Sequence, residues 1–438
     1  MKYTYKLLIL VACFVLMFSV VSIAKSYRTP FSVLSTESSL YTTQESSLEL
    51  LKSFEGEKVL GILLTDGNGR MVAAEFKFVG NVLHVNPSED LVAGKEYEIR
   101  IFTESRKYQI NIKAEDYISI DNNRNSIIKI AANPDKGFNY PYYLLVPQGA
   151  LTNTNKKYMV VEPNNSGTPS DSLEFHEVAV KIHLHDYGYT TGGAGGYQVA
   201  TELKTPLLIP AFPRPRTEDG AGIYTHALDR EAMTVKDVAY ERVDLQLKAM
   251  IEDAQKLLNN EGIKLEKKVF MVGFSASGDF VNRFMFLYPE MVKAIASSSS
   301  TIFPAAEYEG VALNYPLGIA DIEDFTGARF NAEEYAKIPK YIYRGEHDGN
   351  DVTADWDKNG DWYVQAVRKL FGDERYPEKW FKKIRMIEEM GFGDNYQYHI
   401  YKDIGHNITE KMYEDIVSFF KANIGDKFVK ITPHESAN

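Results

Sequence analysis

Residues 268–288, KVFMVGFSASGDFVNRFMFLY, decide how the middle of this 438-residue chain folds. An apolar, β-prone run at 269–272 ends at Gly273, and a short turn of small residues follows around Ser275. Apolar residues then recur at helical spacing over 280–287. The stretch therefore predicts a strand, a sharp turn with a serine at its centre, and a helix.

A serine on so tight a turn has chemical consequences. Its hydroxyl projects out of the sheet, and the amides at the start of the helix point at any anion that develops there. Ser275 is therefore the candidate nucleophile. The turn departs from the strict G-x-S-x-G pattern, because position five is Ser277 and the glycine comes one residue later, at Gly278. An ordinary strand-turn-helix unit with small packing residues is the plain alternative.

A serine nucleophile needs a base, and the base needs an acid that orients it. The short β-type run 340–344 (KYIYR) ends in a Gly-Glu-His-Asp loop, and we select Asp348 as the acid, with Asp351 in reserve. The run 396–401 alternates like a strand and leads into a loop that holds His406. The predicted roles follow from proton transfer: His406 takes the proton of the serine, and Asp348 orients the imidazole.

With these motifs, residues 126–425 resemble an α/β-hydrolase of the esterase/lipase superfamily. The nearest branch is that of polyhydroxybutyrate-depolymerase-like and feruloyl-esterase-like enzymes, in which a strand such as 142–147 leads into the core. The resemblance implies the α/β class, with a mostly parallel sheet and lid insertions. It also implies hydrolysis of carboxylic esters through an acyl-enzyme, with no cofactor and no metal.

The resemblance is incomplete on the side of the oxyanion hole, because no His-Gly pair follows the third strand. Asn164 and Asn165 occupy that position. We expect a backbone amide of one of them, together with the amide of Ala276, to form the oxyanion hole.

Helical patterns alternate with strands in this region, as a parallel sheet requires. Residues 206–211 indicate the fourth strand, 242–258 a helix, and 294–297 the sixth strand. Two stretches, roughly 301–338 and 352–394, exceed the minimal sheet and are rich in aromatic and charged residues. We interpret them as lid or cap insertions that shape substrate choice.

The remaining histidines have simpler interpretations. His183 and His185 lie two residues apart, a spacing that would suit a metal on a strand, but no further ligand pattern completes such a site. His347 is expected to be a loop residue beside the acid. His226 is expected near the start of a helix, with a place in the cleft as the alternative.

Residues 355–361 resemble the start of a calcium loop, but the glutamate expected at loop position twelve is replaced by Ala366. A solvated acidic loop is the preferred interpretation.

The net charge of the chain bears on its possible partners. The formal net charge of −11 argues against nucleic acid as a partner, because phosphate binding needs basic patches and none stands out.

Cys13 is the single cysteine. A chain cleaved after the N-terminal segment would contain none, so no disulfide is expected.

The N-terminus has the features of a targeting segment. Lysines precede eighteen largely apolar residues, 7–24, and the small residues of 22–24 suit a signal peptidase. Residues 1–25 are therefore a signal peptide or an uncleaved membrane anchor, and we expect an extracytoplasmic protein.

Residues 26–45 are Ser/Thr-rich and predict a linker, and 46–116 predict a small all-β sandwich that resembles bacterial Ig-like domains. Turn signals at 66–69 and 80–81 indicate hairpins. The sandwich is expected to act as a spacer or to contact the cell envelope. The hydrolase domain is predicted at 117–430 and a tail at 431–438.

The sequence therefore predicts an extracytoplasmic serine hydrolase that acts on small or polymeric carboxylic esters. Two alternatives stay open. One is a peptidase or amidase that uses the same triad. The other is a surface binding module with a hydrolase fold and no catalysis.

Overall fold

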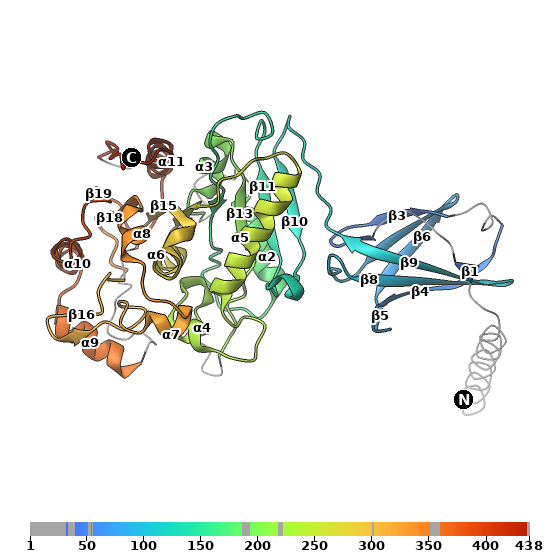
Figure 1. Cartoon of the computed structure of the whole chain (residues 1–438), viewed down its shortest axis with the longest axis horizontal. Coiled ribbons are helices and arrows are strands. Elements are labelled where there is room, and N and C mark those ends of the chain that lie inside the picture. The colour runs from blue at the N-terminus through green and yellow to red at the C-terminus, as the bar shows by residue number, and fades with distance from the viewer. Residues whose placement is uncertain are drawn as a thin grey trace, which may run out of the picture. The chain divides into compact units, whose positions relative to one another are not determined.

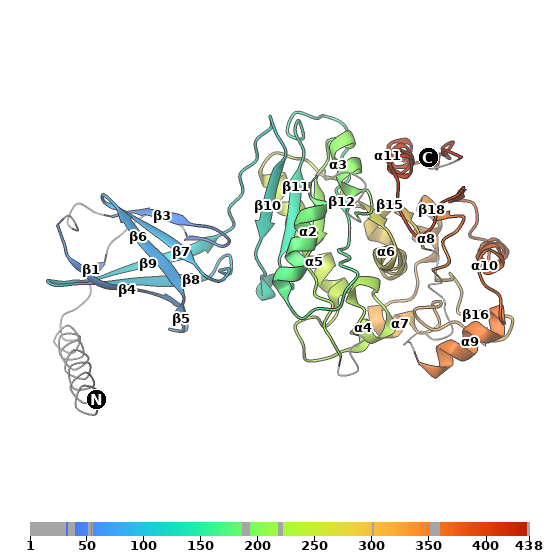
Figure 2. The same ribbon diagram turned by 180° about the vertical axis from the view of Figure 1, so that it is seen from behind.

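The computed structural model describes residues 32–33, 40–50, 54, 56–185, 193–217, 222–299, 302–350 and 360–435. The chain divides into two compact units, Met1–Tyr117 and Ile118–Asn438, and each has its own sheets and core (Figures 1 and 2). The predicted signal or anchor at 7–24 lies outside the described residues. Within the described part, no helix combines the length and the apolar character needed to cross a bilayer.

The first unit is built from two β-sheets. In one the strand order is β1-β9-β8-β4-β5, with β2 beside β9, and in the other it is β3-β7-β6. Their bounds are β1 (Ser32–Val33), β2 (Leu40–Tyr41), β3 (Ser46–Glu49), β4 (Val59–Asp66), β5 (Met71–Val72), β6 (Ala74–Val79), β7 (Val82–Pro87), β8 (Glu96–Thr103) and β9 (Lys107–Glu115). Alternate residues of β8, among them Tyr97, Ile99 and Ile101, are buried in one apolar cluster. This alternation is what a sheet with one face on a core requires.

Two features of the first unit bear on the sequence analysis. The hairpins predicted at 66–69 and 80–81 are confirmed, because β4 pairs with β5 and β6 with β7 in antiparallel fashion. The predicted linker at 26–45 contributes the short strands β1 and β2, which pair with β9. Strands of two residues are too short to show a period-2 pattern. The Ig-like resemblance stays a prediction.

The second unit is organised around one eight-stranded sheet with the order β10-β11-β13-β12-β14-β15-β18-β19. Pairing is antiparallel from β10 through β11 to β13 and parallel from there to β19. The bounds are β10 (Ser126–Ile130), β11 (Tyr142–Val146), β12 (Val160–Val161), β13 (Leu207–Pro210), β14 (Val269–Gly273), β15 (Val292–Ser297), β18 (Lys340–Gly345) and β19 (Tyr396–Tyr401). The predicted fold class, a mostly parallel α/β-hydrolase-type sheet preceded by a small all-β unit, is confirmed.

Helices cover both faces of this sheet (Figures 1 and 2). They are α2 (Leu173–His183), α3 (Gly196–Leu203), α4 (Arg230–Thr234), α5 (Val243–Asn260), α6 (Ala276–Leu287), α7 (Ile322–Thr326), α8 (Ala332–Lys337), α9 (Asp361–Phe371), α10 (Glu378–Glu389) and α11 (Glu410–Ala422). Along β14, Val269 and Met271 belong to the apolar cluster that includes α5 and α6. Phe270 and Val272 belong to the cluster that includes α3 and α11. Burial on both faces explains why this strand is a continuous apolar run.

The two stretches predicted as lid or cap connect β15 to β18 and β18 to β19. The first holds the hairpin of β16 (Glu307–Tyr308) and β17 (Val311–Ala312) with α7 and α8, and the second holds α9 and α10. Tyr335 of α8 and Trp380 of α10 are buried in the same cluster as α5 and α6. Parts of these stretches therefore pack into the core beside α5 and α6, and belong to the helical layer that covers the sheet.

A buried carboxylate fastens two helices to the centre of the sheet. Glu162 directly follows β12, is 2% exposed, and accepts hydrogen bonds from the amides of Ala194 (3.0 Å) and Gly196 (2.8 Å) at the start of α3. His183 at the end of α2 lies 3.1 Å from the same carboxylate. Such an anion at a helix N-terminus satisfies amides that have no partner inside the helix.

The structure places the His183/His185 pair at the end of a helix, so the two residues do not have the strand geometry that the metal alternative would need. His183 is the last residue of α2, and His185 follows just after the helix. The buried residues of α2 are His176, Val180 and His183, spaced by four and three, as on one face of a helix.

The C-terminal residues, predicted as a tail, are attached to the last strand. Gln397 of β19 donates to the carbonyl of Ile431 and accepts from its amide, both at 2.9 Å. His434 donates its amide to Asp415 of α11 at 2.9 Å. An edge strand covered in this way is protected from pairing with another chain.

The contacts of Glu162 lead to a first prediction. In Glu162→Gln, a side-chain NH₂ group faces a backbone N–H, so one buried donor loses its acceptor. The free energy of unfolding should fall by about 1–3 kcal/mol. Urea denaturation followed by circular dichroism measures it.

The matched control is Glu252→Gln, which changes an exposed glutamate of α5 and should leave the urea midpoint unchanged. Equal midpoints for the two variants would contradict the role assigned to Glu162.

Candidate active site

The turn between β14 and α6 holds Ser275 in a strained backbone conformation. Its φ is 57° and its ψ is −125°, values that side-chain-bearing residues adopt only where the surroundings impose them. A Cβ atom placed on Gly273 would lie 2.2 Å from the carbonyl oxygen of Ser277, so only glycine fits at the end of the strand. Ser275 itself is partly exposed, whereas α6 is buried from its first residue, Ala276.

Ser277 explains the departure from G-x-S-x-G. Its hydroxyl accepts a hydrogen bond from the amide of Phe274 at 3.0 Å and donates one to the carbonyl of the same residue at 2.9 Å. The side chain therefore braces the turn from within. Glycine is favoured one residue later, since a Cβ on Gly278 would lie 3.0 Å from the hydroxyl of Ser297.

The structure brings together the three side chains that the sequence selected. His406 Nε2 lies 2.9 Å from Ser275 Oγ, and His406 Nδ1 lies 3.0 Å from Asp348 Oδ2. The three residues follow β14, β18 and β19, which are parallel, so their loops meet at the carboxyl edge of the sheet. The reserve acid, Asp351, lies outside the described residues.

Asp348 is held as a carboxylate. It is 3% exposed, and its Oδ1 accepts from the amide of Asn350 at 3.0 Å and lies 3.6 Å from the guanidinium of Arg344. Burial alone would raise the pKa of Asp348, but the hydrogen bond from His406 and the charge of Arg344 hold it below its ordinary value. These contacts therefore favour the ionised form of the acid.

The surroundings of His406 fix its tautomer. An ionised carboxylate can only accept, so the contact with Asp348 places the ring proton on Nδ1 and leaves Nε2 as the acceptor that faces Ser275. The amide nitrogen of Asn350 lies 3.3 Å from Nε2. The ring of Phe274 stacks on the imidazole at 4.9 Å between centroids and holds its plane.

The loops that carry the acid and the base are packed against each other. A Cβ on Gly345 would lie 2.3 Å from the carbonyl oxygen of Ile404, and the amide of His347 donates to that same carbonyl at 2.7 Å. The amide of Glu346 donates to the carbonyl of Tyr401 at 2.9 Å in the same way. The separation of the acid from the base is therefore set by backbone contacts as well as by the side chains themselves.

The residues expected to form the oxyanion hole lie on both sides of Ser275. Ala276 is the first residue of α6, so its amide has no acceptor inside the helix. Asn164 is buried, and its side chain bonds the amide and carbonyl of Phe212 at 3.2 and 2.8 Å. Asn165 reaches the turn, because its Nδ2 lies 3.4 Å from the carbonyl oxygen of Phe274. The backbone donor on this side stays a prediction.

The other histidines singled out in the sequence have structural contacts. His226 lies in the 3₁₀ turn η3 (Thr225–Ala227), is 1% exposed, and donates from Nε2 to the carbonyl of Phe212 at 2.9 Å. Burial lowers its pKa to about 3, so this imidazole is neutral. The hydrogen bond of His226 therefore holds the segment that follows β13 in place.

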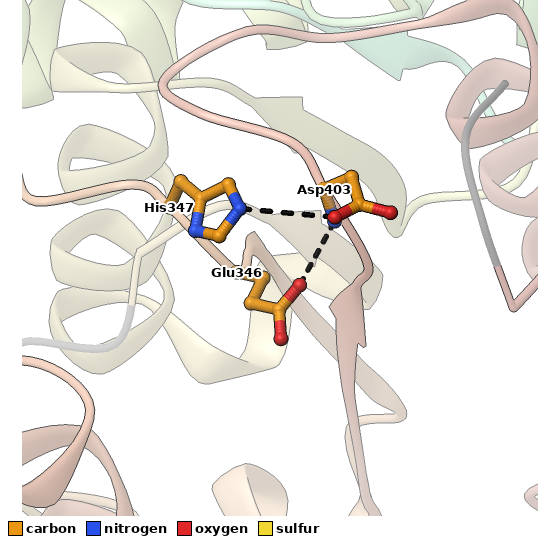
Figure 3. A group of neighbouring side chains, drawn as sticks. All are labelled: Glu346, His347 and Asp403. Carbon is orange, nitrogen blue, oxygen red and sulfur yellow. Dashed lines mark hydrogen bonds and ion pairs between the residues drawn. The ribbon is translucent and has the colours of Figure 1, made fainter.

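A group of potential metal ligands lies beside the acid and base loops. Glu346, His347 and Asp403 place one ligand atom each within 4.8 Å of one another, and all three are exposed (Figure 3). His347 Nε2 lies 3.8 Å from Asp403 Oδ1, and the amide of Asp403 donates to Glu346 at 2.9 Å. These contacts agree with a loop role for His347. Most of the calcium-like stretch at 355–361 lies outside the described residues.

Two supporting serines escaped the sequence analysis. The hydroxyl of Ser298 accepts from the amide of Ser275 at 2.8 Å, and the hydroxyl of Ser299 lies 3.4 Å from its carbonyl oxygen. They belong to a run of four serines, 297–300, that begins at the end of β15. That run beside the central strand was the available signal.

No protein-family profile and no curated protein matches the chain. Several solved structures are similar to part of it. The LpqC poly(3-hydroxybutyrate) depolymerase from Bordetella parapertussis shares 16% identity at a TM-score of 0.39, over 68% of this chain and 88% of that chain. An S-formylglutathione hydrolase from Agrobacterium tumefaciens shares 13% at 0.36, over 70% and 97%. The siderophore hydrolase EstA from Aspergillus nidulans shares 12% at 0.37, over 71% and 98%. Likenesses this distant do not identify a substrate.

The elbow leads to a second prediction. In Gly273→Ala, the added methyl group meets a backbone carbonyl that cannot move without unwinding the start of α6. The melting temperature should fall by several degrees, since overpacking of this kind costs about 1–3 kcal/mol or more.

The control is Gly349→Ala, where an added Cβ meets no described atom within 4 Å. If Gly273→Ala has the same melting temperature as this control, the turn is not constrained in the way described above.

Proposed function

We propose that this protein is a serine hydrolase that cleaves carboxylic esters through an acyl-enzyme. One observation carries the proposal: a single imidazole, that of His406, lies within hydrogen-bond distance of both the Ser275 hydroxyl and the buried Asp348 carboxylate. A nucleophile, a base and an orienting acid in this arrangement form a complete proton-transfer unit.

The first half of the proposed reaction forms the acyl-enzyme. Ser275 Oγ attacks the ester carbonyl carbon while His406 Nε2 takes the hydroxyl proton. The negative charge that develops on the carbonyl oxygen is stabilised by the amide of Ala276 and by the donor expected near Asn165. His406 then gives its proton to the leaving alcohol, and the bond between the carbonyl carbon and the alcohol oxygen breaks.

The second half repeats these steps with water. His406 takes a proton from water, the hydroxide attacks the acyl carbon, and Ser275 leaves with the proton returned by His406. Asp348 stays ionised throughout and stabilises the imidazolium that forms twice in each cycle. The products are a carboxylic acid and an alcohol, so atoms and charges balance.

The choice of ester over amide rests on the family resemblance of the motifs. A nitrophenyl ester compared with an aminoacyl anilide separates the two. The proposed location, outside the cytoplasm, rests on the charged and apolar pattern of residues 1–25. Contact of the first unit with the cell envelope is likewise a proposal.

The third prediction concerns the nucleophile. Ser275→Ala should lower ester turnover on the order of 10⁴-fold or more, because no other group can form the acyl bond. Initial rates with a nitrophenyl ester measure the loss. A fluorophosphonate probe should label the wild type and leave the variant unlabelled.

Ser418→Ala serves as the control, since this serine is exposed on α11. A folded Ser275→Ala protein with the turnover of this control would end the proposal.

The fourth prediction concerns the acid. Asp348→Asn should lower kcat on the order of 10⁴-fold, because the amide donates to Nδ1 and thereby turns the proton of His406 to the wrong nitrogen. Steady-state kinetics measure the effect.

Asp403→Asn, in the exposed part of the base loop, should keep nearly full activity. Asp351→Asn tests the reserve acid. If it damages turnover more than Asp348→Asn, the acid is misassigned while the serine mechanism stands.

A further inference from the structure

Arg214 lacks the carboxylate partner that other arginines of the second unit have. It is partly buried, and no carboxylate among the described residues lies within ion-pair distance of it. The pairs formed by three other arginines are Arg230–Asp321 at 2.6 Å, Arg242–Asp244 at 2.8 Å and Arg344–Asp348 at 3.6 Å. The described part of the chain therefore leaves the charge of Arg214 without an ion pair.

The guanidinium of Arg214 is nevertheless held in one orientation. Its Cζ lies 3.7 Å from the centre of the Tyr224 ring, a stacked cation–π contact. Nη1 donates to the carbonyl of Gly167 at 3.1 Å. Nε is buried and has no hydrogen-bond partner among the described residues, and Nη2 donates to none of them. The described residues thus fix the plane of the guanidinium and leave two of its three nitrogens without an acceptor.

The surroundings of Arg214 compensate its charge only weakly. His226 and His176, both buried and the second bonded to the Arg214 amide at 3.2 Å, are neutral because burial lowers the pKa of each. Burial also lowers the pKa of Arg214 itself, and the interactions with Tyr224 and Asp229 oppose this only in part. Holding a cation in such surroundings costs free energy that an anion from a ligand would return.

A short chain of hydrogen bonds connects Arg214 to the elbow. Arg214 bonds the carbonyl of Gly167, whose amide donates to Asn165 Oδ1 at 3.1 Å. Asn165 in turn lies 3.4 Å from the carbonyl of Phe274, the residue before the candidate nucleophile. The segments after β12 and β13 also run side by side, because the amide of Ser170 donates to the Arg214 carbonyl at 2.7 Å.

Tyr224, on whose ring Arg214 stacks, belongs to a segment held by contacts with the helix that follows the elbow. Tyr224 precedes η3, and η3 packs against α6, the helix that starts at the elbow. Arg283 of α6 donates to the carbonyl of Ala227 at 2.8 Å and holds this segment in place. Arg214 and Tyr224 are therefore positioned by the same elements that position Ser275.

We infer that Arg214 binds an ionised carboxyl group of the substrate, so that the protein acts on esters whose acyl or alcohol part carries a second, negatively charged group. The inference rests on the proposed ester hydrolysis. An N–H group of a fixed, planar guanidinium that the described residues leave without an acceptor can donate to a carboxylate. Arg214 determines specificity and takes no part in proton transfer.

The experiment compares charged and neutral esters of equal length on the full chain. For the acyl side, mono-4-nitrophenyl adipate is compared with 4-nitrophenyl hexanoate. For the alcohol side, 4-acetoxybenzoate is compared with methyl 4-acetoxybenzoate. The readout is the ratio of kcat/KM, charged over neutral, after subtraction of enzyme-free hydrolysis.

Arg214→Gln should lower kcat/KM for the charged ester of one pair by about 10- to 100-fold, the range of a charge-assisted hydrogen bond, and change the neutral ester less than about 3-fold. Arg214→Lys should restore part of the loss, since it returns the charge without the planar guanidinium. Arg216→Gln, an exposed neighbour two residues along, should leave the ratio unchanged.

The outcomes separate this inference from the proposed function. If the wild type hydrolyses the neutral esters and reacts with a fluorophosphonate, but Arg214→Gln leaves both ratios unchanged or lowers charged and neutral turnover equally, the inference is overturned and the hydrolase stands. If the wild type neither hydrolyses any of the four esters nor reacts with the probe, the proposed function fails and the inference falls with it.

Discussion

The strained backbone of Ser275 is the constraint on which the candidate site depends. A residue at φ 57° and ψ −125° is unfavourable by itself and persists only because its neighbours leave no alternative. Gly273 has no room for a side chain, and the hydroxyl of Ser277 closes the turn on Phe274. The strain has a geometric result: the serine side chain leaves the sheet at the point where His406 can reach it.

The sequence predicted strands correctly, and pointed to candidate site residues, where a short apolar pattern leads directly into a loop with a chemically active side chain. The run 396–401 was predicted as a strand and is β19, and the run 340–344 is β18 with one residue added. Because parallel strands bring their carboxyl ends to one edge, the order of Ser275, Asp348 and His406 along the chain already implied that their loops could meet. The contact distances then follow from the backbone bonds between those loops.

The sequence was insufficient where a role depends on contacts between distant segments. Nothing in the sequence around Glu162 indicates its role, because that role depends on contacts with the start of α3 and the end of α2. His183 and His185 have a spacing that would suit a metal on a strand, whereas the residues that α2 buries, His183 among them, have helical spacing. Asn164 and Asn165 are adjacent in sequence, yet the side chain of one holds the segment after β13 and that of the other contacts the turn.

On the proposed function, two arginines near the candidate site have different roles. Arg344 is satisfied within the protein, since its guanidinium bonds the carbonyl of Asp348 at 2.7 and 3.0 Å and lies near the carboxylate. Arg214 has no such partner among the described residues, and on the proposed reading a ligand brings the anion that balances its charge. On this proposal, the proton-transfer unit is complete before a substrate binds, whereas the anion that pairs with Arg214 comes from the substrate. Because the two arginines share no hydrogen-bond partner among the described residues, a change in Arg214 should alter substrate choice without altering the proton transfer that Arg344 supports.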